Sequence, residues 1–296
     1  MSLLTRIFRG EPEAAPAGAA RLGAFHPAGA GAPGEFEASW LAATGAAGAA
    51  LSVAPGEAGP LDCKVGGQPY LPPGAPWPTA GPALGGRPLF HLAQLNLAQL
   101  PPLPGWPPSG LLQFFIAGGD THGMRLEDLA CGAGHAVLYH PEPAQAPAWG
   151  AWPPGPHPDA PAQARPIRDL ELPFVAERAA RLAARPVTVP LCRTDCRSQL
   201  RALDLANPAA GAAGWPYWPQ AAAWRGHLAG GNPFFLGDDP RAMPAYASFT
   251  TLLLQLDSDP AAALNWGEGG LCNFFIEPER LAALDFSRVL YHWDCR

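Results

Sequence analysis

The feature that most constrains this chain is an internal repeat. Residues 106–116 (WPPSGLLQFFI) match residues 266–276 (WGEGGLCNFFI) without gaps, and six of the eleven positions are identical. Two further blocks match upstream: Gly66–Pro69 with Gly230–Pro233, and His91–Asn96 with Leu252–Asp257. The offsets of the three pairs are 160, 161 and 164, so both order and spacing are kept. We infer two copies of one supersecondary unit, packed around a pseudo-twofold axis.

The repeated unit predicts two strands joined by a short turn. Its first apolar run lies at 88–95 or 249–256, and its second at 111–116 or 271–276. The first runs show little alternation, which indicates burial on both faces. The 38 Pro and 34 Gly residues exclude a helical bundle. We therefore predict an α+β fold, a β-rich mixed sheet built from two pseudo-twofold-related repeats, with short helices and long Pro/Gly-rich loops. Helices are expected at three places: Glu35–Ala43, Phe174–Ala184 and Thr194–Leu205.

Composition divides the chain into a leading segment and one domain. Residues 1–60 are rich in Ala, Gly and Pro and carry few large apolar side chains, so we expect them to be partly mobile. The domain then runs over 61–296. Repeat one spans about 61–140, a connecting insert 141–224, and repeat two about 225–296.

Charge and cysteine usage limit the partners and the location. A net charge of −6 argues against a chain-wide nucleic-acid surface. No apolar run reaches the ~20 residues of a membrane helix, so we expect no membrane association. The first residues lack the apolar stretch of a signal peptide. Six cysteines without an export signal are typical of reduced thiols, and we expect a cytoplasmic protein.

The repeat also aligns polar side chains that are candidates for ligand binding. On the first strands, a period of two places Gln94 with Asn96, and Gln255 with Asp257, on one face; Gln113 and Asn273 are equivalent on the second strands. These six groups are expected to converge near the pseudo-axis. One interpretation is a polar cleft for a small ligand. The other is that the amides tie strand ends to neighbouring backbone, as most buried polar groups do.

An acidic cluster in the second repeat has the character of metal ligands. Asp257 and Asp259 end a strand, and Glu268 follows in the next turn, so the three could share a hard cation. The alternative is that Ser258 or Asp259 caps a helical turn that begins at Pro260. No cofactor is otherwise predicted.

Two further groups of side chains are weaker candidates. Cys192 and Cys196 have i, i+4 spacing that suits one soft metal, with His292 and Cys295 as conceivable partners, but no second close pair completes the site. Trp215, Tyr217 and Trp218 lie on a Pro-rich stretch outside both repeats. They are candidate anchors for a protein partner, or else they cap the sheet.

Several longer stretches carry a family resemblance. They are KVGGQPYLP (64–72), HLAQLNL (91–97), GLLQFFI (110–116) and AVLY (136–139) in the first half, and GNPFF (231–235), DPR (239–241), LLLQLDSD (252–259), WGEGG (266–270) and DFSRVLYHWDC (285–295) in the second. Over 61–296 the chain resembles the YwqG-like family, a bacterial family of uncharacterised function. The resemblance implies an α+β fold with an internal duplication and no established reaction. Similar sequences usually carry Gln near Leu236–Asp238, and Asp in place of Glu268.

No complete catalytic set can be identified, and Gly-x-Ser-x-Gly and phosphate-loop patterns are absent. We therefore favour a non-enzymatic protein that binds another protein; an immunity or accessory role beside a bacterial toxin is one version, suggested by the resemblance alone. One alternative is a metal-dependent hydrolase that uses Asp257, Asp259 and Glu268. A second is a small-ligand binder with an amide-lined cleft between the repeats.

Overall fold

The structure is a computed structural model that describes residues 41–42, 44–144, 171–190 and 225–295. Over these residues the chain forms ten strands: β1 (Ala46–Val53), β2 (Lys64–Val65), β3 (Phe90–Asn96), β4 (Leu111–Ile116), β5 (His135–His140), β6 (Ala180–Val189), β7 (His227–Gly230), β8 (Thr251–Asp257), β9 (Leu271–Ile276) and β10 (Leu290–Asp294). Between them lie short helical segments: η2 (Pro82–Leu84), η3 (Leu97–Gln99), η6 (Pro240–Ala242), η7 (Pro244–Tyr246), η8 (Pro260–Ala262) and α5 (Pro278–Ala282).

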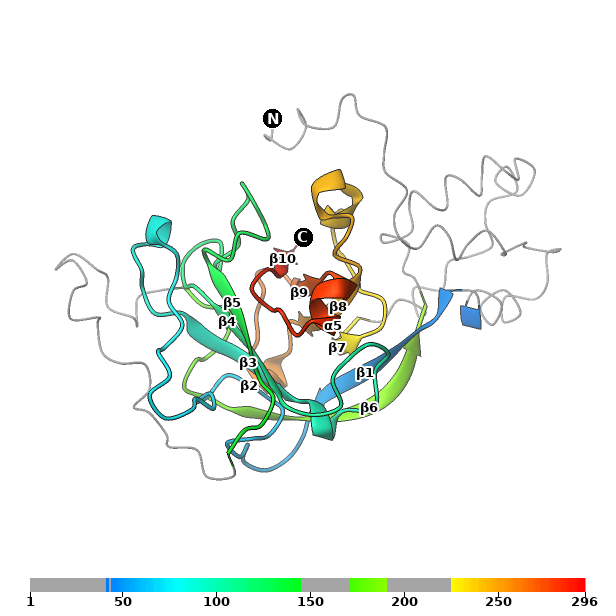
Figure 1. Ribbon diagram of the computed structural model, residues 1–296, viewed down its shortest axis with the longest axis horizontal. Helices are drawn as coiled ribbons and strands as arrows, with labels where there is room; N and C mark the ends of the chain where they lie inside the picture. The colour runs from blue at the N-terminus through cyan, green and yellow to red at the C-terminus, as the bar shows by residue number, and fades with distance from the viewer. Residues whose placement is uncertain (1–40, 43, 145–170, 191–224, 296) are drawn as a thin grey trace.

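The ten strands form one sheet in the order β10-β9-β8-β7-β1-β6-β2-β3-β4-β5, and every neighbouring pair is antiparallel. The order is symmetric about the β1–β6 pair, because each of β1 to β5 has its counterpart in β6 to β10. We call β2–β5 the first wing and β7–β10 the second wing. The long β1 and β6 run along the base of the molecule, and the wings rise from it on either side (Figure 1).

The two repeats interlock through their first strands. Strands β1 and β6 lie outside the repeat bounds predicted from the sequence, but they hold equivalent places in the sheet and so add a first strand to each copy. Strand β1 precedes the first wing along the chain but pairs with β7 of the second, and β6 precedes the second wing but pairs with β2 of the first. The two exchanged strands also pair with each other, from Ala46 opposite Val189 to Val53 opposite Leu182. Each repeat thus completes the sheet of the other.

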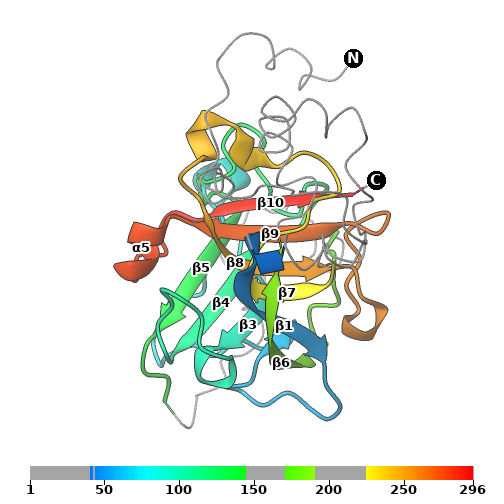
Figure 2. The ribbon, with the colours of Figure 1, turned by 90° about the vertical axis from the view of Figure 1, so that its right-hand side faces the viewer.

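The core lies between the wings, whose strands cross steeply when seen from the side (Figure 2). The rings of Phe114 and Phe274, equivalent in the repeats, meet with centroids 5.0 Å apart, as expected where a pseudo-twofold axis passes. Strands β3 and β8 each carry an irregularity at the equivalent residues Leu92 and Leu253. Details of backbone geometry are therefore duplicated along with the sequence.

The Gly-Gly pairs of the repeat end β2 and β7. Both glycines have positive φ in each copy, 64° and 65° at Gly66 and Gly67, and 65° and 73° at Gly230 and Gly231. Residues with a Cβ rarely adopt this left-handed conformation, so two in succession require glycine. This turn explains why the motif appears in both copies.

The α+β expectation, with its mixed sheet, is wrong: the described residues form an antiparallel sheet with only short helical segments, most of them 3-10 turns. The helix expected over Phe174–Ala184 is also wrong, since Ala180–Val189 is strand β6. Its Ala and Arg residues favour helix locally, but pairing with β1 and β2 overrides that preference. The helices expected at Glu35–Ala43 and Thr194–Leu205 lie outside the described residues, apart from Leu41 and Ala42, which are helical.

Candidate functional site

In the first repeat, the buried amides of Gln94 and Gln113 belong to a closed hydrogen-bond network. Gln113 Nε2 donates to Gln94 Oε1 and to the Tyr70 carbonyl, each at 2.8 Å. Gln94 Nε2 donates in turn to the Asp62 carbonyl at 3.0 Å. Since Gln113 uses its nitrogen as donor, its Oε1 must accept from His140 Nε2 at 2.9 Å. The network leaves no atom of either amide unused.

The second repeat reproduces most of these contacts. Gln255 Nε2 donates to the Gly226 carbonyl at 2.8 Å, and Gln255 Oε1 accepts from the Phe234 N–H at 2.7 Å. Asn273 Nδ2 donates to the Phe234 carbonyl at 3.0 Å. Gly226 and Phe234 stand where Asp62 and Tyr70 stand in the first repeat. Both strand glutamines therefore make the backbone contacts that the strand-tying interpretation predicts.

The copies differ at the position that closes the network. Asn273 is one methylene shorter than Gln113, and its Oδ1 is buried without a hydrogen-bond partner. Its neighbour on the adjacent strand, at the place of the donor His140, is the acceptor Asp294. The Oδ1 of Asp294 and the Nδ1 of His292 are likewise buried without a partner. Three buried polar atoms without a hydrogen-bond partner, one each on Asn273, His292 and Asp294, thus lie on β9 and β10.

Register places these three side chains together. His292 lies directly opposite Asn273, and Asp294 follows two residues later on the same face of β10. Burial lowers the pKa of His292 and raises the pKa of Asp294. The second oxygen of Asp294 is held by the N–H groups of Leu236 (2.9 Å) and Gly237 (2.7 Å). The carboxylate is therefore fixed in position with one oxygen left over.

The six predicted ligand-binding groups do not share one cleft. Gln94 and Gln113 lie on the first wing, and Gln255 and Asn273 on the second. Gln113 precedes Phe114, and Asn273 precedes Phe274, so both amides point away from the core in which those rings meet. Alternation along the strands thus separates the two sets by the thickness of the core.

Asn96, the remaining amide, ties its strand end to the chain on either side. Asn96 Nδ2 donates to the Leu61 carbonyl at 2.9 Å, and Asn96 Oδ1 accepts from the Ala98 N–H at 3.1 Å, where it caps η3. Each hydrogen bond of this side chain goes to backbone.

Two of the acidic candidates of the second repeat bind protein side chains. Asp257 pairs with Arg225 at 3.0 Å, and Asp259 accepts a hydrogen bond from His227 Nε2 at 3.2 Å. Asp259 Oδ1 also accepts from the Ala261 N–H at 2.8 Å and caps η8, with Pro260 at its first position. The predicted cap is confirmed. The third candidate, Glu268, is exposed on the following turn.

His227 is fully engaged by this arrangement. Its Nδ1 accepts from the Asp257 N–H at 3.1 Å, which places the ring proton on Nε2 toward Asp259. Burial lowers the pKa of His227, which keeps the ring neutral. In the first repeat the equivalent Asn96 N–H donates to Cys63 Sγ at 3.1 Å. This histidine therefore repeats a structural contact and has no free nitrogen for proton transfer. Across the part of the chain that the structure describes, no group of three or more His, Cys, Asp or Glu side chains is arranged to hold a metal ion.

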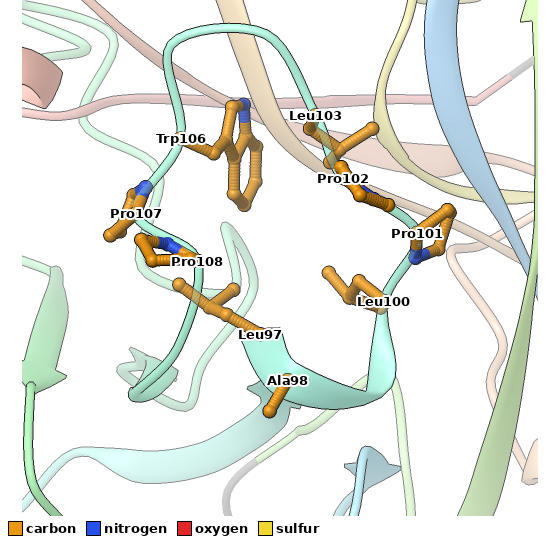
Figure 3. Close-up of a pocket in the computed structure, with 9 residues that line it drawn as sticks. All are labelled: Leu97, Ala98, Leu100, Pro101, Pro102, Leu103, Trp106, Pro107 and Pro108. Atoms are coloured by element: carbon orange, nitrogen blue, oxygen red, sulfur yellow. The ribbon is translucent and has the colours of Figure 1, made fainter.

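A separate, apolar pocket of about 290 Å³ opens in the loop between β3 and β4. Figure 3 shows the Trp106 indole and Leu100 pointing into the space between the limbs of this loop. All nine lining residues are Leu, Ala, Pro or Trp: Leu97, Ala98, Leu100, Pro101, Pro102, Leu103, Trp106, Pro107 and Pro108. The equivalent Trp266 is fully buried in the core.

Some candidates cannot be placed. Trp215, Tyr217, Trp218, Cys192 and Cys196 lie outside the described residues. The cysteines within them, Cys63, Cys131, Cys272 and Cys295, are free thiols.

Sequence reasoning missed Asp294 and gave His292 only a minor part. The signal lies in the equivalence of β5 and β10 between the two repeats, which requires alignment of residues 136–140 with 290–294. These strands share too few residue types for the repeat to reveal it.

No helix in the described ranges is both long and apolar enough to cross a bilayer. None of the curated proteins matches the chain. A family model described as a domain of unknown function, DUF1963, matches residues 63–295, which include both wings and the His292–Asp294 pair. Since this match covers most of the sequence, the chain belongs to the DUF1963 family.

Proposed function

We propose that this protein binds another protein and catalyses no reaction. The observation that carries the proposal is the pocket of the β3–β4 loop, because none of its lining side chains is ionisable or nucleophilic. Such a surface can seat an apolar side chain but supplies no group for acid–base or covalent chemistry. Trp106 on its rim is the residue type that most often dominates binding energy at protein interfaces.

The partner that fits inserts an apolar side chain from a basic surface. The pocket volume of about 290 Å³ limits the part of the partner that can enter it to a few side-chain groups. The net charge of −6 favours a partner of opposite sign and would speed its association. Stoichiometric binding of a toxin or an assembly factor would be a case of this kind. Within DUF1963 we propose that the chain is a YwqG-like bacterial protein, because it shares long motifs with that family. We propose that it is cytoplasmic, because its described cysteines are free thiols.

Native mass spectrometry of complexes isolated at low ionic strength tests the proposal. We expect one basic polypeptide at fixed stoichiometry with the wild type, and its loss with Trp106→Ala. Leu126→Ser is the matched control, since Leu126 is an exposed apolar residue (69%) outside the pocket and should retain the partner. Thermal melting confirms that each variant folds. A partner that is kept by Trp106→Ala, or lost equally from both variants, would refute the pocket as its binding site.

A further inference from the structure

The two copies of the repeat allow the hydrogen bonding of their outward-facing amides to be compared. In the first copy, every polar atom of Gln94 and Gln113 is satisfied, and His140 provides the last donor. In the second copy, that donor is replaced by Asp294 and the longer amide by Asn273. The substitution removes a donor and adds an acceptor at the same point.

The orphaned atoms are all candidates for lone-pair donation. Asn273 is fully buried, and because its Nδ2 donates to Phe234, its outward atom is the carbonyl oxygen. Asp294 offers Oδ1, while its Oδ2 is held by two backbone N–H groups, as is usual for carboxylates that bind metals. His292 offers Nδ1, which is buried without a hydrogen-bond partner.

Nearby positive side chains do not supply the missing donor. The Arg241 guanidinium is paired with Asp239 at 2.8 Å and stacks over Phe275 at 4.5 Å. Arg225 is paired with Asp257 at 3.0 Å. The buried Oδ1 of Asp294 thus lies on the same face of β9 and β10 as the Asn273 Oδ1 and the His292 Nδ1, and a cation would supply the partner that these three atoms lack.

We propose that Asn273, His292 and Asp294 form a binding site for a divalent transition-metal cation, built on the second repeat only. One imidazole nitrogen and two oxygens are a mixed set that suits ions such as Mn²⁺ or Zn²⁺ better than the all-oxygen preference of Ca²⁺. Two His/Asp ligands and one amide oxygen leave positions for water or a further ligand. The site is independent of the proposed partner pocket, which lies on the other repeat.

Titration of EDTA-treated protein with Mn²⁺, with free Mn²⁺ followed by electron paramagnetic resonance, tests the site. Mn²⁺ is the chosen probe because the exposed Cys295 thiol next to Asp294 would compete for Zn²⁺. We expect one saturable site in the wild type, and binding weakened by more than about tenfold in His292→Ala. The matched control His140→Ala removes the histidine that closes the first copy, at the position that Asp294 holds in the second, and should leave Mn²⁺ binding unchanged.

Asp294→Asn provides a second readout that does not depend on metal. Its new amide can keep the two backbone contacts and donate toward Asn273, so it closes the second copy as His140 closes the first. We expect a higher melting temperature than wild type in EDTA, together with loss of Mn²⁺ binding. Absence of a saturable Mn²⁺ site in the wild type would overturn the proposal. So would an unchanged melting temperature in Asp294→Asn, which would mean that water or a side-chain rotation already satisfies these atoms.

Discussion

Lys64, the single lysine of the chain, shows how burial changes the pKa of one side chain. It lies on β2 with 1% of its surface exposed, and its Nζ donates to the carbonyls of Gly59 (3.2 Å) and Pro60 (3.4 Å). Burial lowers its pKa to about 8 from the usual 10.5. The equivalent residue of the second repeat is Leu228, so the position accepts an apolar side chain.

Stability should therefore depend on pH through Lys64. Between about pH 8 and 10.5, the unfolded chain holds a proton on this amine that the folded protein has lost, so the unfolding free energy rises with pH. The gain is at most about 3 kcal/mol. Lys64→Met should lack it. We would measure urea unfolding of both proteins across this range. Subtracting the unfolding free energy of Lys64→Met from that of the wild type removes the opposing titration of Cys63, whose pKa burial raises to about 11, because both proteins contain this thiol. A difference in unfolding free energy that stays constant with pH would contradict a buried, titrating amine.

At the scale of the elements, the strand glutamines hold β3 and β8 to the segments that precede and follow β2 and β7. Gln255→Leu should leave the Phe234 N–H and the Gly226 carbonyl without these bonds, at a cost of about 1–3 kcal/mol for each group that stays buried. Gln94→Leu should cost at least as much, because it loses the equivalent backbone contacts and also the hydrogen bond that Gln94 accepts from Gln113. Chemical unfolding measures both.

The matched control for these two variants is Gln99→Leu. Gln99 also bonds to Asp62 and to the Cys63 N–H, but its side chain is exposed, so water can replace much of what is lost. We expect a smaller loss of stability than in either buried variant. Equal losses in all three would mean that burial of the amide adds nothing. A neutral Gln255→Leu would contradict a role of this amide in holding β8 to its neighbouring segments.

The elements also show what could be predicted from the sequence. Strands β3, β4, β8 and β9 are apolar runs that the repeat marks twice, so pattern alone finds them. Strands β1 and β6 are not marked, because AAGAALSV and the Ala/Arg run of β6 have low β-propensity and become strands by pairing with each other and with β7 and β2. No local signal encodes that pairing. The predicted α+β class followed from counting helices where the chain forms strands.

At the scale of the site, the sequence identified the polar residues but not their geometry. The sequence predicted that Gln94, Gln113, Gln255 and Asn273 meet in one cleft. Side chains alternate along a strand, so Gln113 and Asn273 point away from the core in which Phe114 and Phe274 meet, and the two amides of each wing lie on its outer face. The sequence also could not show which amide atoms stay unsatisfied, since that depends on Asp294 replacing His140 across a strand pair.

At the scale of the whole molecule, exchange of β1 and β6 makes the two repeats one folding unit. Cleavage at a protease site inserted within residues 145–170, outside the described segments, separates β1–β5 from β6–β10. The two fragments remain joined by the β1–β6, β1–β7 and β2–β6 pairs and by the core between the wings. We expect them to coelute on size exclusion in native buffer, because separation would expose strands that each repeat lends to the other. Elution as separate halves would contradict the exchange.

A second cut, within residues 191–224, is the matched comparison for the first. It separates β1–β6 from β7–β10, and the only strand pair that then joins the fragments among the described residues is β1–β7, from Gly48 opposite Gly230 to Leu51 opposite His227. The wings still pack through the same core, so the two nicked proteins differ mainly in strand pairing. Fragments from the second cut should therefore dissociate at a lower urea concentration than those from the first. The same midpoint for both would mean that the core alone holds the repeats together, and that the exchanged strands contribute little to their association.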